Sequence, residues 1–172
     1  DPQAAEFFLD QASRSVTVVR AEGLPYRPTP EERILLVGND RDFLGEGRAR
    51  FPEADILTFE TSNFYYSSPE DRAAFRRIAD RYDTIIYCLS DPNSLQVLQS
   101  AGPLSARVIV FSILTPVYLT ELPWVENAVA VYGWGRESFE AGYAAILGDY
   151  APGGRMPVGF VDGPKRPLFE DE

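Results

Sequence analysis

Carboxylates and hydroxyls are the side chains of this sequence that could perform chemistry, because its 172 residues include no histidine. Without histidine there is no Ser-His-Asp or Cys-His catalysis and no histidine-ligated metal. The single cysteine, Cys88, has no partner for a disulfide or an ordinary zinc site. It lies inside an apolar run, which predicts a buried structural thiol. Ser112 and Ser138 lack a base, so neither is predicted to be a nucleophile.

Asp91 is the carboxylate whose position suggests a catalytic use. It lies in the segment SDPN, residues 90–93, directly after an apolar run that predicts a buried strand. In open α/β sheets ligands bind at the carboxyl ends of the strands, so Asp91 is a candidate catalytic or sugar-binding residue. An aspartate before a helix ordinarily serves as its N-cap, and we favour that interpretation.

The loop after the first long apolar run, GNDRDFLG at residues 38–45, occupies the place where a dinucleotide-binding fold has Gly-x-Gly-x-x-Gly. The second glycine of that fingerprint is replaced by Asp40, and Asp42 follows. Two carboxylates would repel a diphosphate. The loop therefore predicts a plain strand-to-helix turn, and the sequence predicts no cofactor and no metal site.

Aromatic side chains gather in predicted loops. The segment NFYYS, residues 63–67, has three interpretations: a loop folded onto the domain's own surface, a protein interface, or a platform for a sugar. Other aromatic residues follow predicted strands in the last third of the chain. The predicted substrate or interface residues are Asn63, Tyr65, Tyr66, Tyr118, Trp124 and Trp134.

Continuous apolar runs define the elements that must position these side chains. Runs at 34–37, 84–89, 108–111 and 128–131 lack polar alternation, which is typical of parallel strands buried on both faces. A further strand is predicted at 55–59, and helices are predicted at 4–13, 68–82, 93–100 and 138–147. Alternating strands and helices predict a three-layer α/β sandwich with a mostly parallel sheet of about five or six strands.

One domain is expected, in three parts. Residues 1–30 form an N-terminal helix-strand arm that packs on the domain, residues 31–162 form the α/β domain, and residues 163–172 form a poorly ordered tail that is rich in proline and acidic residues. The chain begins at Asp1 without an initiator methionine, so we expect a processed protein or a fragment of a longer one.

The net charge of the chain indicates which classes of binding partner are unfavourable. The net charge of −10 disfavours nucleic acids and anionic membrane surfaces as partners. No apolar run approaches the roughly 20 residues needed to span a bilayer. The lone cysteine does not reveal the compartment.

Several segments of the chain share their order and spacing with a known enzyme family. They are ARVIVFS at 106–112, TPVYL at 115–119, LPWV at 122–125, AVYGW at 130–134 and AAILGDYAPGGRMPV at 144–158, preceded in the arm by ASRSVTVVR at 12–20 and GLPY at 23–26. In this order they resemble the C-terminal α/β domain of family 3 glycoside hydrolases, most of all the β-N-acetylglucosaminidase branch, and the arm resembles the family's entry into this domain. Met156 stands where the family has leucine.

This resemblance implies a six-stranded sheet packed beside a TIM barrel, which supplies the aspartate nucleophile and most sugar-binding groups. In the β-glucosidase branch a glutamate on this domain is the acid/base, and Asp91 is the nearest carboxylate in a comparable place. Retaining hydrolysis needs two carboxyl groups about 5 Å apart, which one candidate does not provide.

We therefore predict an accessory domain that packs against a barrel and shapes the substrate entrance but is not catalytic alone. The alternative is a stand-alone binding or interaction module that keeps the fold. A barrel-sized coding segment upstream of Asp1 would distinguish the two.

Overall fold

A six-stranded sheet forms the centre of the computed structural model, which describes residues 2–59 and 67–156. Its strand order is β1-β6-β5-β4-β2-β3, with β1 antiparallel to β6 and every other pair parallel. The predicted mostly parallel α/β sheet is confirmed. The strands are β1 (Thr17–Ala21), β2 (Ile34–Val37), β3 (Asp55–Leu57), β4 (Thr84–Leu89), β5 (Arg107–Ser112) and β6 (Asn127–Ala130).

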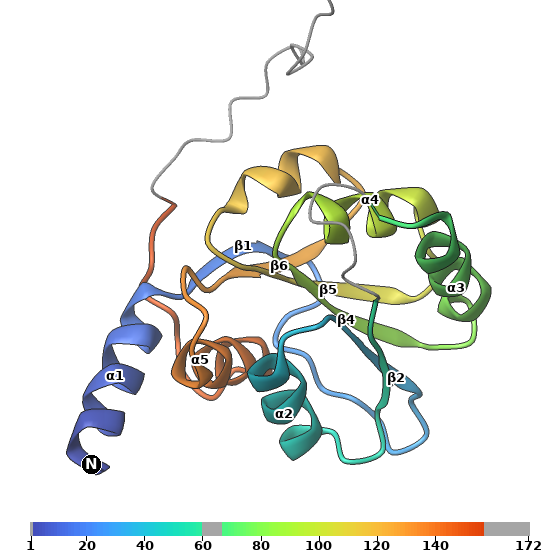
Figure 1. Ribbon diagram of the computed structural model, residues 1–172. Coiled ribbons are helices and arrows are strands. Elements are labelled where there is room, and N and C mark those ends of the chain that lie inside the picture. Colours follow the sequence, from blue (N-terminus) through green and yellow to red (C-terminus); the bar gives the residue numbers. More distant parts are fainter. Residues whose placement is uncertain (1, 60–66, 157–172) are drawn as a thin grey trace, which may run out of the picture.

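Helices cover both faces of the sheet and complete three layers (Figure 1). One face carries α1 (Pro2–Ser15), α2 (Arg41–Arg50) and α5 (Arg136–Leu147). The other carries α3 (Pro69–Ala79), α4 (Pro92–Ala101) and the 3₁₀ helix η1 (Pro116–Glu121). The sheet therefore separates two apolar cores.

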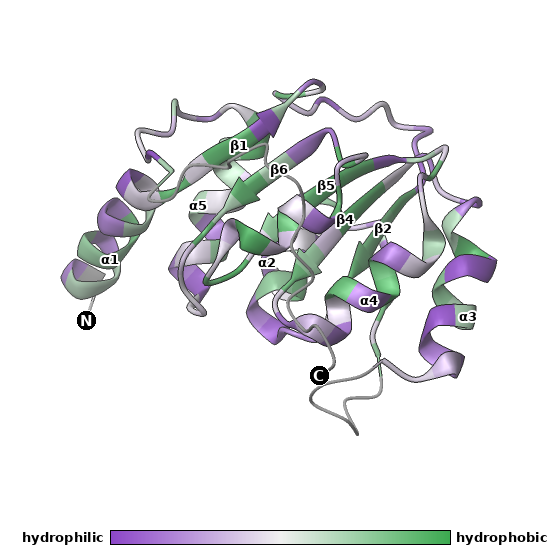
Figure 2. Cartoon of the chain, turned by 90° about the horizontal axis from the view of Figure 1, so that it is seen from above, coloured by the Kyte–Doolittle hydropathy of each residue, from purple (hydrophilic) through white to green (hydrophobic). Residues whose placement is uncertain are grey.

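The central strands have apolar side chains on both faces because both faces are covered. All residues of β2, β4 and β6 are buried, and Figure 2 shows the hydrophobic colour concentrated along the strands. The four apolar runs predicted to be parallel neighbours are neighbours, in the order β6-β5-β4-β2. In the first core, Phe43 of α2 stacks against Tyr143 of α5 at a ring-centroid distance of 5.6 Å.

The N-terminal segment adds an edge strand to this sheet. The Arg20 guanidinium of β1 donates hydrogen bonds to the carbonyls of Leu122 (2.6 Å), Val125 (2.7 Å) and Leu119 (2.9 Å). These bonds satisfy carbonyls at the end of η1 and in the loop that leads to β6. Helix α1 packs on the first core through Leu9 and Ala12.

Several helices begin or end at residues with ordinary capping chemistry. The Ser68 hydroxyl accepts a hydrogen bond from the Asp71 amide (2.9 Å), and Pro69 opens α3. Gly148 ends α5 in the left-handed conformation, with φ 74°.

Helix α2 was not among the predicted helices because its sequence, RDFLGEGRAR, contains two poor helix formers. Tertiary packing explains one of them. A Cβ atom on Gly47 would lie 2.5 Å from Tyr143 Oη, so glycine allows α2 to approach α5 closely.

Ile109→Asp is expected to unfold the domain. Ile109 is 0% exposed at the centre of β5, and an unpaired buried charge costs several kcal/mol, comparable with the whole stability of about 5–15 kcal/mol. Urea unfolding followed by circular dichroism measures this. Ile56→Asp is the matched control, because Ile56 is 42% exposed on edge strand β3 and its substitution should cost much less. A folded Ile109→Asp variant with unchanged melting would show that the burial assignment is wrong.

Candidate functional site

A cleft of about 220 Å³ opens at the carboxyl edge of the sheet, where β2 and β4 end. Helix α2 leaves β2 toward one face and α4 leaves β4 toward the other, so the cleft lies where the direction of the connections reverses. Open α/β sheets bind ligands at such switch points. The cleft is lined by Gly38, Asn39, Asp40, Phe59, Cys88, Ser90, Asp91, Asn93, Ser94 and Trp134.

Asp91 is the N-cap of α4, as favoured from the sequence. Its Oδ1 accepts a hydrogen bond from the Ser94 amide (2.7 Å), and Ser94 Oγ accepts one from the Asp91 amide (3.1 Å). This reciprocal capping box satisfies two amides at the start of the helix. Because Oδ1 is used in the helix cap, Asp91 would contact a ligand with its second carboxylate oxygen.

Asp40 performs the same task for α2. Its Oδ1 accepts hydrogen bonds from the amides of Asp42 (2.8 Å) and Phe43 (2.9 Å). The neighbouring Asn39 Oδ1 accepts a hydrogen bond from the Phe59 amide (2.7 Å), which joins the ends of β2 and β3. The loop is thus the predicted strand-to-helix turn, and its aspartate is a cap.

Gly38 and Cys88 form the floor of the cleft. A Cβ atom on Gly38 would lie 2.6 Å from the Cβ of Cys88, so only glycine fits beside the thiol at this strand pair. Cys88 is buried, as predicted. Burial raises the pKa of its thiol, and the charges of Asp40 and Asp91 raise it further. The thiol therefore stays protonated at neutral pH, which makes it a poor nucleophile.

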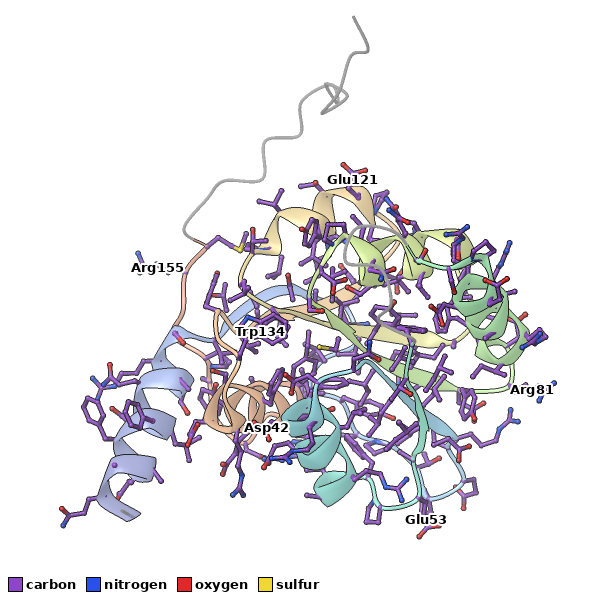
Figure 3. The ribbon with its side chains drawn as sticks, viewed as in Figure 1. Asp42, Glu53, Arg81, Glu121, Trp134 and Arg155 are labelled. Carbon is purple, nitrogen blue, oxygen red and sulfur yellow. The ribbon has the colours of Figure 1, made fainter. Side chains whose placement is uncertain are left out.

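Trp134 forms the outer wall of the cleft, on the loop that leads from β6 into α5 (Figure 3). Its side chain is 47% exposed. Tyr132, two residues earlier, has φ 39°, which is uncommon for a non-glycine residue. Leu114 follows the neighbouring strand β5 with φ 63° and is also exposed. Such conformations cluster at functional sites.

The other aromatic residues predicted for a substrate or interface lie elsewhere. Tyr118 and Trp124 are half-buried against the second core, and Trp124 lines a separate hollow beside the amino ends of β5 and β6. Asn63, Tyr65 and Tyr66 lie outside the described residues, as does the predicted tail at 163–172. The structure therefore brings together two of the predicted residues, Asp91 and Trp134.

Sequence reasoning did not select Asn39, Phe59 or Asn93 for this site, and it interpreted Asp40 only as an obstacle to a diphosphate. The usable signal was their position at or just after the end of a predicted strand, or at the start of a predicted helix. Within residues 2–59 and 67–156, no group of three or more acidic or cysteine side chains is placed to hold a metal ion. None of the helices in these ranges is both long and apolar enough to cross a membrane.

Two substitutions of Asp91 distinguish its role as a helix cap from a requirement for its negative charge. Asp91→Asn should leave the free energy of unfolding nearly unchanged, because asparagine caps about as well as aspartate. Asp91→Ala should lower it by about 1 kcal/mol, because the Ser94 amide loses its acceptor. Urea unfolding of both variants is the measurement. Equal losses in the two variants would mean that the carboxylate charge, rather than the cap geometry, matters.

Solved structures similar to this fold include glycoside hydrolases. A fungal multi-domain β-N-acetylglucosaminidase of glycoside hydrolase family 3 matches with a TM-score of 0.76 and 19% identity, over 95% of this chain and 20% of that chain. The family 3 β-N-acetylglucosaminidase of Paenibacillus sp. str. FPU-7 matches with a TM-score of 0.74 and 16% identity, over 91% and 32%. A β-glucosidase from Listeria innocua has a TM-score of 0.68 and 15% identity, over 87% and 26%.

No protein-family model and no curated protein matches the sequence. The chain spans between a fifth and a third of the length of these solved structures. The resemblance drawn from the sequence is confirmed at the level of fold: this chain has the α/β fold of a part of family 3 glycoside hydrolases.

Proposed function

We propose that this chain is the C-terminal accessory domain of a family 3 glycoside hydrolase of the β-N-acetylhexosaminidase type. It packs against a TIM-barrel domain, shapes the substrate entrance and is not catalytic alone. The observation that carries the proposal is a cleft at the carboxyl edge of the sheet with exposed apolar residues beside it, in a fold that matches only part of much longer glycosidases.

The apolar residues at this edge supply the surface for the barrel. Leu114 is 51% exposed, Val117 50% and Trp134 47%. They lie on the segments that follow β5 and β6, two paired strands. Leu114 exposes its side chain from a left-handed backbone that is unfavourable for leucine. A strained backbone that exposes an apolar side chain to solvent is explained if a partner domain covers that side chain.

The lining of the cleft suits one wall of a sugar subsite. Trp134 and Phe59 offer apolar ring surface, and Asn39, Asn93 and Asp91 offer amide and carboxylate groups. Sugars are held by this combination, because their C–H faces pack on rings while their hydroxyls form hydrogen bonds. The acidic caps disfavour an anionic group at this position.

The accessory role follows from the chemistry of the available carboxylates. Retaining hydrolysis needs a nucleophile and an acid/base about 5 Å apart. Asp40 and Asp91 each use one carboxylate oxygen to cap a helix, which is a structural task. The nucleophile then comes from the barrel.

The isolated chain should fold but should not hydrolyse a chromogenic N-acetylglucosaminide or a chromogenic glucoside. Release of the chromophore above the buffer rate, lost on Asp91→Asn, would make the chain a self-contained enzyme and overturn the proposal.

In the barrel-containing enzyme, Asp91→Asn should lower turnover by about 10²–10⁴-fold if Asp91 donates the proton, and should leave turnover unchanged if it only caps α4.

The alternative, a stand-alone module that binds glycans, predicts a different result with the same protein. It requires titration of the isolated chain with N-acetylglucosamine to show binding, which Trp134→Ala abolishes and Trp124→Ala preserves. Trp124 is the matched control because it lines a different hollow. The accessory proposal expects the sugar to bind tightly only when the barrel completes the site.

A further inference from the structure

We infer that Glu46 is a positioning residue for Trp134: by bonding α2 to the first turn of α5, it sets the width of the cleft between Asp40 and Trp134. The inference rests on the proposed function, because it takes Trp134 to be a wall of the substrate entrance. Its geometry, however, can be measured in the isolated chain without any substrate.

Glu46 joins the two helices with both carboxylate oxygens. Oε1 accepts a hydrogen bond from Arg136 Nε of α5 (2.7 Å), and Oε2 accepts one from Arg50 Nη1 of α2 (2.7 Å). Glu46 is buried, with 10% of its side-chain surface exposed, and its partners are the largely covered Arg50 and the more exposed Arg136. A buried carboxylate held by two guanidinium groups has little freedom to move.

Arg136 is the first residue of α5, directly after the Trp134 loop. Gly135, the N-cap of α5, has no side chain to cap the helix, so the bond from Arg136 to Glu46 is the side-chain anchor of the first turn. The loop itself is folded tightly onto that turn, because a Cβ atom on Gly133 would lie 2.6 Å from Ser138 Oγ. Movement of the first turn of α5 therefore carries Trp134 with it.

On the other side, Glu46 lies on the helix whose N-cap is Asp40. Asp40 and Trp134 both line the cleft but belong to segments far apart in the sequence. Glu46 connects those segments through one side chain. The two sides of the cleft consequently keep their separation as long as Glu46 is charged and bonded to Arg136.

The charged and titratable groups around Glu46 come from both helices. Arg50 lies on α2, and Arg136, Glu137, Glu140 and Tyr143 lie on α5. Burial alone would raise the pKa of the Glu46 carboxyl, but the hydrogen bonds and charges of Arg50 and Arg136 lower it below the ordinary glutamate value. A carboxylate whose pKa is lowered in the folded protein stabilises it at neutral pH and loses that contribution as the pH falls through the folded-state pKa. The bond between Glu46 and Arg136 is therefore present at neutral pH and is lost in acid.

The test uses the fluorescence anisotropy of Trp134 in full-length chains that carry Trp124→Phe, which leaves Trp134 as the single tryptophan. Arg136→Met should lower the anisotropy at neutral pH by roughly a third, because a released loop moves on the nanosecond timescale. Glu46→Gln should also lower the anisotropy of Trp134 at neutral pH. In the chain with Glu46, acidification should lower the anisotropy with a midpoint below 4.5, the ordinary glutamate value, and Glu46→Gln should remove this step.

Arg50→Met is the matched control, since it removes the other partner of Glu46 and the contacts of Arg50 with Glu140 O and Tyr143 farther along α5, but leaves the Arg136 bond at the first turn in place. It should leave the anisotropy of Trp134 unchanged. An unchanged anisotropy in Arg136→Met, or an equal fall in Arg50→Met, would overturn the inference. If circular dichroism shows that Glu46→Gln does not fold, the comparison of Arg136→Met with Arg50→Met still tests the inference. A confirmed anisotropy effect with unaltered turnover in the barrel-containing enzyme would count against the proposed function and not against the positioning role.

Discussion

The parallel pairing of β2 with β4 is the interaction on which the cleft depends. At the end of this pair, Gly38 meets Cys88 so closely that no side chain fits on the β2 side. The next residues then diverge, with α2 leaving toward one face and α4 toward the other. Because the two strands are in direct contact and their helices are not, a hollow must form above the strand ends. Phe59 and Trp134 close its sides.

Buried and partly buried polar groups hold the segments around this sheet at fixed positions. Arg20 holds the η1 segment with three hydrogen bonds, and Glu46 joins α2 to α5. At the amino edge, Glu32 accepts hydrogen bonds from Tyr26 Oη (2.9 Å) and from Thr84 Oγ1, which ties the connector before β2 to β4. Each of these charged groups is satisfied by hydrogen bonds, as buried charges require. They fix which loops lie at the carboxyl edge and which lie at the opposite one.

The two edges of the sheet differ in the surface that they offer. The carboxyl edge combines exposed apolar residues, two non-glycine residues with positive φ, and a cleft with carboxylate and amide groups. The amino edge has wider and more polar hollows. This asymmetry supports the proposal that the carboxyl edge, rather than the amino edge, faces a partner domain and the substrate entrance.

The sequence by itself determined the sheet, because four apolar runs without polar alternation leave no face for water. It also favoured a cap as the role of Asp91 and predicted the burial of Cys88, since both interpretations rest on the adjoining residues alone. The pairing of Asp40 with Asp91 at one cleft, and the place of Trp134 across from them, were decided only by the tertiary structure. Strand order and the faces taken by α2, α4 and α5 set these distances. Strand order and helix placement depend on long-range packing, such as the fit of Gly47 against Tyr143, that no local pattern encodes.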